Sequence, residues 1–115
     1  MVRRGEYGEI LARRYLEEQG LRVLETNFRF HHGEIDIVAE EGDALIFCEV
    51  KTRFSDTFGT PELAVTAKKQ RQIRKLAGAY LATHRIRDRI CRFDVVAIRV
   101  DNGVASVHYL RDAFR

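Results

Sequence analysis

Two acidic side chains and a lysine stand at spacings that could support metal-ion chemistry. Asp36 and Glu49 are separated by twelve residues, and Lys51 follows Glu49 after a single residue. Carboxylate oxygens suit hard cations such as Mg²⁺ or Mn²⁺, and no set of softer ligands points to zinc. A lysine close to a ligating acid could position water or stabilise charge on a phosphate group. The alternative is a solvated strand face with an ordinary Glu–Lys pair.

The segments that carry these residues predict a β-hairpin. Residues 33–39 and 45–51 are apolar runs rich in β-branched residues, and Glu41-Gly42-Asp43 between them is typical of a turn. A hairpin would bring Asp36 of its first strand close to the acid and lysine of its second.

Strand alternation predicts which side chains of this hairpin share a face. Glu34 and Asp36 should lie on one face, and Ile35 and Ile37 on the other. Two carboxylates about 6.7 Å apart along a strand repel by roughly 2.5 kcal/mol at an effective dielectric constant of about 20. A divalent cation between them would turn that repulsion into attraction.

Composition favours one globular α/β domain over residues 1–115. The chain has 45% hydrophobic and 32% charged residues, which excludes disordered and fibrous classes. Met1 to Ile10 contains no apolar run, so we expect neither a signal peptide nor a membrane span, and we expect a cytoplasmic location without membrane partners. Cys48 and Cys91 lack C-x-x-C spacing, which favours two buried, reduced thiols.

Charge is unevenly distributed, although the net charge is only +3. Residues 6–49 contain eleven acids and four arginines, whereas residues 68–92 contain nine lysines and arginines and one aspartate. An acidic region that holds cations, beside a basic region that neutralises phosphates, would suit an enzyme acting on a polyanion. Ordinary solvated surface charge is the alternative.

The first helix is predicted over residues 5–19 and ends at Gly20. Glu9 lies at the flank of its apolar stripe, so its carboxylate could reach the border of the core, or it could simply favour the helix dipole. The stripe comprises Leu11, Ala12, Tyr15 and Leu16. A strand follows over residues 21–30, and the neighbouring residues His31 and His32 are expected in a turn, not on a metal. The core candidates of that strand are Leu21, Val23, Leu24 and Phe28.

A longer helix is predicted to begin after the cap residue Thr66 and to end near His84. The segment 52–61 before it is irregular and could carry Arg53 over a bound substrate, and Thr60-Pro61-Glu62 suggests a further helix start. Cations crowd the first turns of the longer helix, where they oppose the helix dipole, which indicates a negatively charged partner. These cations are Lys68, Lys69, Arg71, Arg74 and Lys75.

The last third of the chain predicts two strands. Residues 85–92 form a basic connection that could hold a nucleic-acid backbone, and residues 93–100 are apolar on both faces, as in a strand covered by helices. Asp101-Asn102-Gly103 is typical of a hairpin turn into residues 104–110. The resulting order, α-β-β-β-α-β-β, predicts an α/β fold with a mixed sheet.

Taken together, Glu9, Gly33-Glu34-Ile35-Asp36, Glu49-Val50-Lys51-Thr52-Arg53, Lys68 and Arg92-Phe93-Asp94-Val95 resemble a known family. The chain resembles the YraN family of small bacterial proteins, which is similar to archaeal Holliday junction resolvases within the restriction-endonuclease-like superfamily. The likeness extends from Gly5-Glu6 to Ala113-Phe114, although Ile35 stands where that superfamily often has a proline.

The resemblance implies a restriction-endonuclease-like, three-layer domain with a mixed β-sheet flanked by helices. It implies that Asp36, Glu49 and the carbonyl of Val50 bind Mg²⁺ or Mn²⁺, that Lys51 is catalytic, and that Glu9 joins the site. It also implies a nuclease that hydrolyses phosphodiester bonds in DNA, with branched or damaged DNA as candidate substrates, and a homodimer by analogy. The alternatives are a non-catalytic nucleic-acid-binding module on this fold and a protein-interaction domain.

Overall fold

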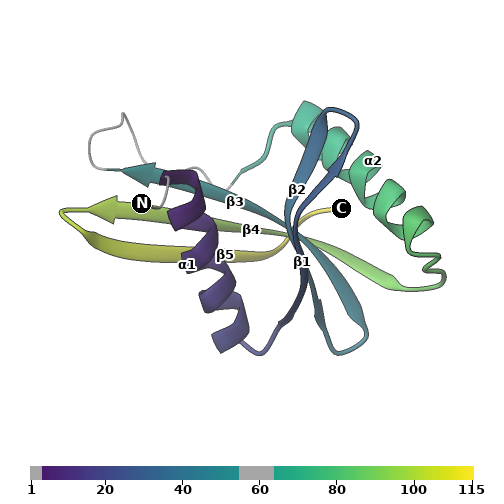
Figure 1. Cartoon of the computed structure of the whole chain (residues 1–115), viewed down its shortest axis with the longest axis horizontal. Helices are drawn as coiled ribbons and strands as arrows, with labels where there is room; N and C mark the ends of the chain where they lie inside the picture. The colour runs from purple at the N-terminus through teal and green to yellow at the C-terminus, as the bar shows by residue number, and fades with distance from the viewer. Residues whose placement is uncertain (1–3, 55–63) are drawn as a thin grey trace.

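The computed structural model describes residues 4–54 and 64–115. Its elements follow the predicted order α-β-β-β-α-β-β, which confirms the α/β class (Figure 1). They are α1 (Arg4–Glu18), β1 (Arg22–Phe30), β2 (Gly33–Glu41), β3 (Ala44–Phe54), α2 (Ala67–Thr83), β4 (Ile90–Asp101) and β5 (Val104–Phe114).

The strands form one mixed sheet in the order β1-β2-β3-β4-β5. Neighbouring strands are antiparallel except β3 and β4, which are parallel because the chain returns through α2. The β1–β2 hairpin crosses the long strands β3, β4 and β5 steeply (Figure 1). This crossing creates the place where β2 and β3 part.

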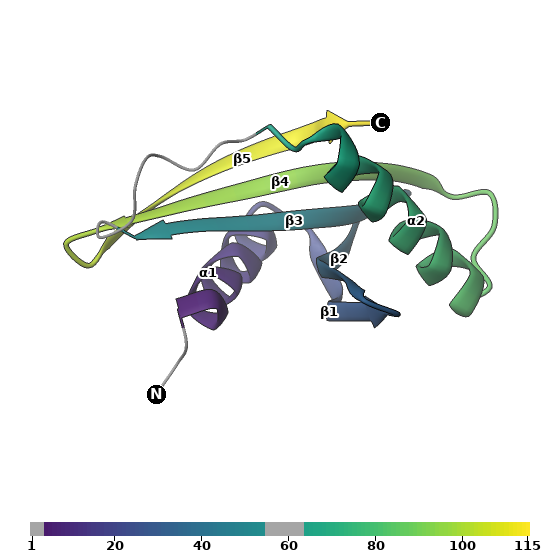
Figure 2. The same cartoon turned by 90° about the horizontal axis from the view of Figure 1, so that it is seen from above.

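The two helices cover opposite faces of the sheet, as the three-layer prediction requires (Figure 2). Ile46 and Cys48 of β3 belong to a core layer with Leu16 of α1. Their neighbour Phe47 belongs to a second layer with Tyr80 of α2. Successive residues of β3 therefore pack into hydrophobic cores on opposite faces of the sheet.

Local turn and cap signals are confirmed at several positions. The side-chain oxygen of Thr66 accepts a hydrogen bond from the Lys69 N–H at 3.2 Å, and α2 begins at the next residue. Asn102 and Gly103 both have left-handed backbone conformations, with φ of 51° and 77°, as a two-residue hairpin turn requires.

Strand β4 is longer than predicted. Ile90–Asp101 form the strand because residues 90–92 pair with residues 44–46 of β3. The predicted basic connection over residues 85–92 is therefore wrong in its last three residues. Arg89 and Arg92 also form ion pairs with Glu40 and Glu41 at 2.9 and 3.0 Å, so these two cations are engaged within the protein.

Three further expectations need correction or fall outside the described residues. Thr52–Phe54 were expected to be irregular, but they extend β3 by pairing with Ile98–Val100. The rest of that segment, including Thr60-Pro61-Glu62, lies outside the described residues. Leu24 was expected in the core but is 37% exposed, because the β1 register shifts between Val23 and Glu25.

Both cysteines are free thiols, as predicted, although only Cys48 is fully buried. Within residues 4–54 and 64–115, no helix is long and apolar enough to cross a membrane.

Candidate metal centre

The candidate site lies where β2 and β3 separate. The antiparallel pairing of β2 with β3 extends from the turn that joins them to the pair Ile37 and Cys48. The next residue of β2 is Asp36, and its Oδ2 accepts a hydrogen bond from the Val50 N–H at 2.7 Å. Beyond this pair, the Asp36 carboxylate therefore accepts the hydrogen bond that a backbone carbonyl of β2 would otherwise accept from β3.

The predicted alternation of β2 is wrong at Asp36. Ile35 belongs to the core layer under α2, whereas Ile37 belongs to the layer under α1, so the two do not share a face. The residue opposite Asp36 in the β1–β2 register is Asn27, which has a left-handed φ of 55°. Asparagine tolerates this conformation better than most residues. The break in alternation turns Asp36 toward the gap beside β3.

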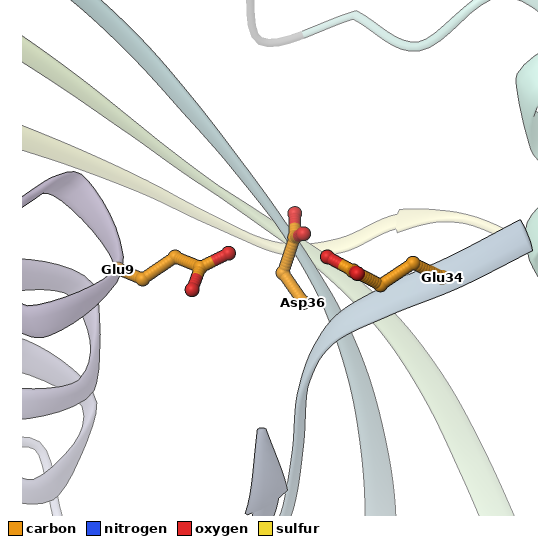
Figure 3. Close-up of side chains that lie close together, drawn as sticks. All are labelled: Glu9, Glu34 and Asp36. Atoms are coloured by element: carbon orange, nitrogen blue, oxygen red, sulfur yellow. The ribbon is translucent and has the colours of Figure 1, made fainter. Parts of the chain in front are cut away.

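Three carboxylates converge at this break. Glu9 from α1 and Glu34 and Asp36 from β2 each place an oxygen atom within 4.8 Å of the others. Figure 3 shows Glu9 reaching from the helix toward Asp36, with Glu34 approaching from the other side. Glu9 therefore reaches the site, and not merely the helix terminus.

Close packing of α1 on β3 brings Glu9 to this position. A Cβ atom added at Gly8 would lie 2.0 Å from Oγ1 of Thr52, so no larger residue fits there without a shift. The side-chain amide of Asn27 donates a hydrogen bond to the Glu9 carboxylate. Asn27 thus contacts Glu9 from a position in β1 that has a left-handed backbone conformation.

Glu49 extends the acidic group on the β3 side. Its carboxylate accepts a hydrogen bond from Asp36 when Asp36 is protonated, which favours the neutral form of Asp36. Lys69 of α2 approaches the other side of Glu49 at 3.5 Å. Arg29 similarly pairs with Glu34 at 2.8 Å.

The pKa values of two of these acids reflect the crowding. Burial, followed by the hydrogen bond that the protonated Asp36 carboxyl donates to Glu49, raises the pKa of Asp36 to about 8. Burial also raises the pKa of Glu9, and the charge of Glu34 adds to the rise, while the Asn27 hydrogen bond opposes it. Both acids would ionise more readily beside a cation.

An open cleft gives access to Glu9 and Glu34. It has a volume of about 310 Å³ and lies between α1 and the β1–β2 hairpin. Glu9 and Glu34 line it together with Arg29 and Asn27. A cation or a phosphate group could therefore reach the carboxylates from solvent.

The structure also places the two other predicted site groups. Lys51 shares a face of β3 with Glu49, and its amine donates a hydrogen bond to the Ala64 carbonyl at 2.6 Å. Val50, whose carbonyl is predicted to bind the metal ion, contacts Asp36 through its N–H.

The predicted nucleic-acid contacts lie along α2 and at the end of β3. The exposed residues include Lys68, Arg71 and Lys75 of α2 and Arg53 near the end of β3. Arg74 of α2 donates a hydrogen bond to the Arg115 carbonyl at 2.7 Å.

Sequence reasoning missed Asn27 as a site residue. It placed Glu34 on the same strand face as Asp36 but did not include Glu34 among the predicted ligands, although the spacing of two residues was a usable signal. Asn27 lies within a strand, where asparagine is uncommon, and that too marks an irregular backbone position.

The fold and the site define a mixed α/β domain with a cluster of carboxylates at the parting of a central hairpin. A family model described as "Uncharacterised protein family UPF0102" matches residues 8–98, and the chain belongs to this family, the YraN family that the sequence resembles. It is 46% identical to a UPF0102 protein of Syntrophus aciditrophicus, over 98% of this chain and 89% of the relative. A UPF0102 protein of Moorella thermoacetica is 46% identical over 97% of this chain and 95% of the relative. A UPF0102 protein of Beutenbergia cavernae is 49% identical over 93% of this chain and 92% of the relative.

Proposed function

We propose that this protein is a metal-dependent nuclease that hydrolyses phosphodiester bonds in DNA. The observation that carries the proposal is the charge balance of the site. Glu9, Glu34 and Asp36 place oxygen atoms within 4.8 Å of one another, and Glu49 interacts with Asp36. The cations paired with these four acids are Arg29 and Lys69. Fully ionised, this group has two surplus negative charges, which one divalent cation would balance.

The donor set fits Mg²⁺ or Mn²⁺. All the side-chain ligands are carboxylate oxygens, which such hard cations prefer, and the raised pKa of Asp36 marks an acid that lacks a counter-charge. Asp36 is the central ligand, because it contacts Glu49 on one side and lies beside Glu9 and Glu34 on the other. A cation bound here would polarise the scissile phosphate and lower the pKa of an attacking water.

The basic residues of the chain would bind and orient the substrate. The exposed cations of α2, with Arg53 at the end of β3, would neutralise backbone phosphates, which contribute affinity but no base specificity. Lys51 would leave the Ala64 carbonyl and stabilise the charge that develops on the phosphate. A homodimer would suit a branched substrate with two-fold symmetry.

The decisive experiment is a cleavage panel with single-stranded, duplex, flapped and four-way DNA, and RNA, in Mg²⁺ or Mn²⁺. We expect metal-dependent cleavage of at least one DNA class by the wild-type protein, and none by Asp36→Asn, which keeps the shape of the side chain but not its charge. Glu18→Gln makes the corresponding change at an exposed acid of α1 and should cleave normally. Equal cleavage by wild type and Asp36→Asn would refute the proposal.

The second candidate is a nucleic-acid-binding module without catalysis. The hydrogen bond from Lys51 to Ala64 favours it, because a lysine held by a carbonyl is turned away from a phosphate. Binding that weakens steeply with salt, together with no cleavage of any substrate in the panel, would establish this alternative.

A further inference from the structure

A cavity of about 260 Å³ lies between the β1–β2 turn and α2. Phe30 and Leu76 give it apolar walls, and polar groups surround its opening. The remaining lining residues are His31, His32, Gly33, Gln72 and Lys75. We propose that this cavity binds an unpaired nucleobase of the substrate, an inference that rests on the proposed action on nucleic acid.

The walls of the cavity suit a flat aromatic ring. Phe30 is 40% exposed although it ends a strand of the sheet, and the ring of His31 contacts it edge-on at 4.3 Å between centroids. Gly33 lets the turn approach α2 closely, since a Cβ atom there would lie 2.9 Å from the methyl groups of Leu76. An exposed aromatic ring beside an apolar wall is what a stacking base requires.

The polar rim distinguishes a nucleotide from a purely apolar ligand. Lys75 carries a positive charge at the opening, and Lys68 and Arg71 lie exposed on the same helix. Gln72 offers an amide that can both donate and accept hydrogen bonds. A base with its attached phosphate combines an apolar plane, hydrogen-bonding edges and a negative charge.

The cavity lies close enough to the carboxylates to share one strand of substrate. Gly33 lines the cavity, and the next residue, Glu34, belongs to the acidic group. Lys69 approaches Glu49, and Gln72 and Lys75 follow at every third position along a ridge of α2. Six helical residues span about 9 Å along α2.

This placement specifies the substrate class. Bases within a duplex are stacked and paired, so a base can enter the cavity only from a flap, a gap, a junction arm or a single strand. The cavity would therefore select nucleic acid with an unpaired base close to the scissile phosphate.

The test measures binding without cleavage. Fluorescein-labelled flapped DNA is titrated with protein in EDTA while anisotropy is recorded, and each base of the flap is replaced in turn by an abasic site. For the wild type, one abasic position should weaken binding about five- to a hundredfold. Phe30→Ala should weaken binding to intact flap by a similar factor and should remove the abasic effect, whereas Phe30→Tyr should keep it.

Leu24→Ala is the matched control, because Leu24 is 37% exposed on the same strand and should behave as wild type. Gln72→Glu provides a second variant that does not depend on the folding of Phe30→Ala. It adds a negative charge at an exposed rim position and should weaken binding at least fivefold.

Three results would overturn the proposal, and the first two are no abasic position that weakens binding and an abasic effect that persists in Phe30→Ala. Binding of Gln72→Glu at wild-type affinity would also overturn it. The outcome is separate from the nuclease proposal. Base-dependent binding without cleavage would leave the cavity assignment standing, and cleavage without base-dependent binding would remove the cavity assignment alone.

Discussion

Asp36 and Asp94 are both largely withdrawn from water, but their surroundings are opposite. Asp94 is 0% exposed, and donors surround it: Arg92 makes two hydrogen bonds of 2.9 Å, and Tyr109 and the Asp112 N–H complete the set. Asp36 receives one backbone N–H, while its other neighbours are acids.

The comparison separates a structural carboxylate from one that lacks a counter-charge. The charge of Asp94 is fully satisfied within the fold, where it ties β5 to β4 and Arg92 extends the network to Glu41 at the end of β2. The fold leaves Asp36 without an equivalent cation. A buried acid that the protein itself does not neutralise is a candidate for ligand binding.

The largest expected effect comes from removing the satisfied carboxylate. Asp94→Ala should lower the free energy of unfolding by about 3 to 5 kcal/mol, because it leaves Arg92 and Tyr109 without their buried partner. Urea denaturation monitored by circular dichroism measures this change.

Asp101→Ala is the control for Asp94→Ala, since Asp101 is an exposed acid that pairs with Arg99 on the same strand. Its loss should cost less than about 1 kcal/mol. If the two variants were equally stable, Asp94 would not be the structural acid of the pair.

The second effect is a pH dependence that arises from Asp36. Its folded pKa of about 8 lies above the ordinary value of 3.8, so the folded protein binds the proton more tightly than the unfolded chain does. The resulting stability is complete below about pH 4 and is lost as the pH rises through about 8, at no more than about 1.4 kcal/mol per pH unit.

Urea midpoints in EDTA from pH 5 to pH 8 measure this dependence. Wild type should become less stable across the range, and Asp36→Asn should show a flatter profile because it has no charge to acquire. A wild-type profile as flat as that of Asp36→Asn would contradict the comparison.

Local features of the fold could be predicted from the sequence because they depend on residues close together in the chain. Thr66 caps α2, Asn102 and Gly103 form the hairpin turn, and the apolar stripe of α1 faces the core, as predicted. In each case the backbone preference and the hydrophobic pattern agree.

The details of the site could not be predicted, since they depend on packing between distant segments. Strict alternation along β2 does not predict that the strand changes face at Asp36. This change occurs opposite Asn27 of β1, which has a left-handed backbone conformation. The pairing of Arg89 with Glu40 and the hydrogen bond from Lys51 to Ala64 likewise join residues far apart in the chain.

The third effect is stabilisation by a divalent cation. If Asp36 lacks a counter-charge, Mg²⁺ at one hundred times its dissociation constant should raise the free energy of unfolding by about 2.7 kcal/mol. Thermal unfolding at increasing MgCl₂, with NaCl at matched ionic strength as control, measures this. Asp36→Asn should show no response beyond that of NaCl, and an equal response in both proteins would place the bound ion elsewhere.

The smallest effect tests how closely α1 must approach β3 to bring Glu9 to the site. Gly8→Ala should lower the free energy of unfolding by about 1 to 3 kcal/mol, because its new methyl group meets Oγ1 of Thr52, and it should weaken the response to Mg²⁺ by moving Glu9. Gly5→Ala is the matched control in the same helix. Nothing lies within 4 Å of a Cβ at Gly5, so alanine there should be neutral or slightly stabilising. If Gly8→Ala kept the full Mg²⁺ response despite its lower stability, Glu9 would not be part of the cation site, and the contrast with Asp94 would rest on the acids of β2 and β3 alone.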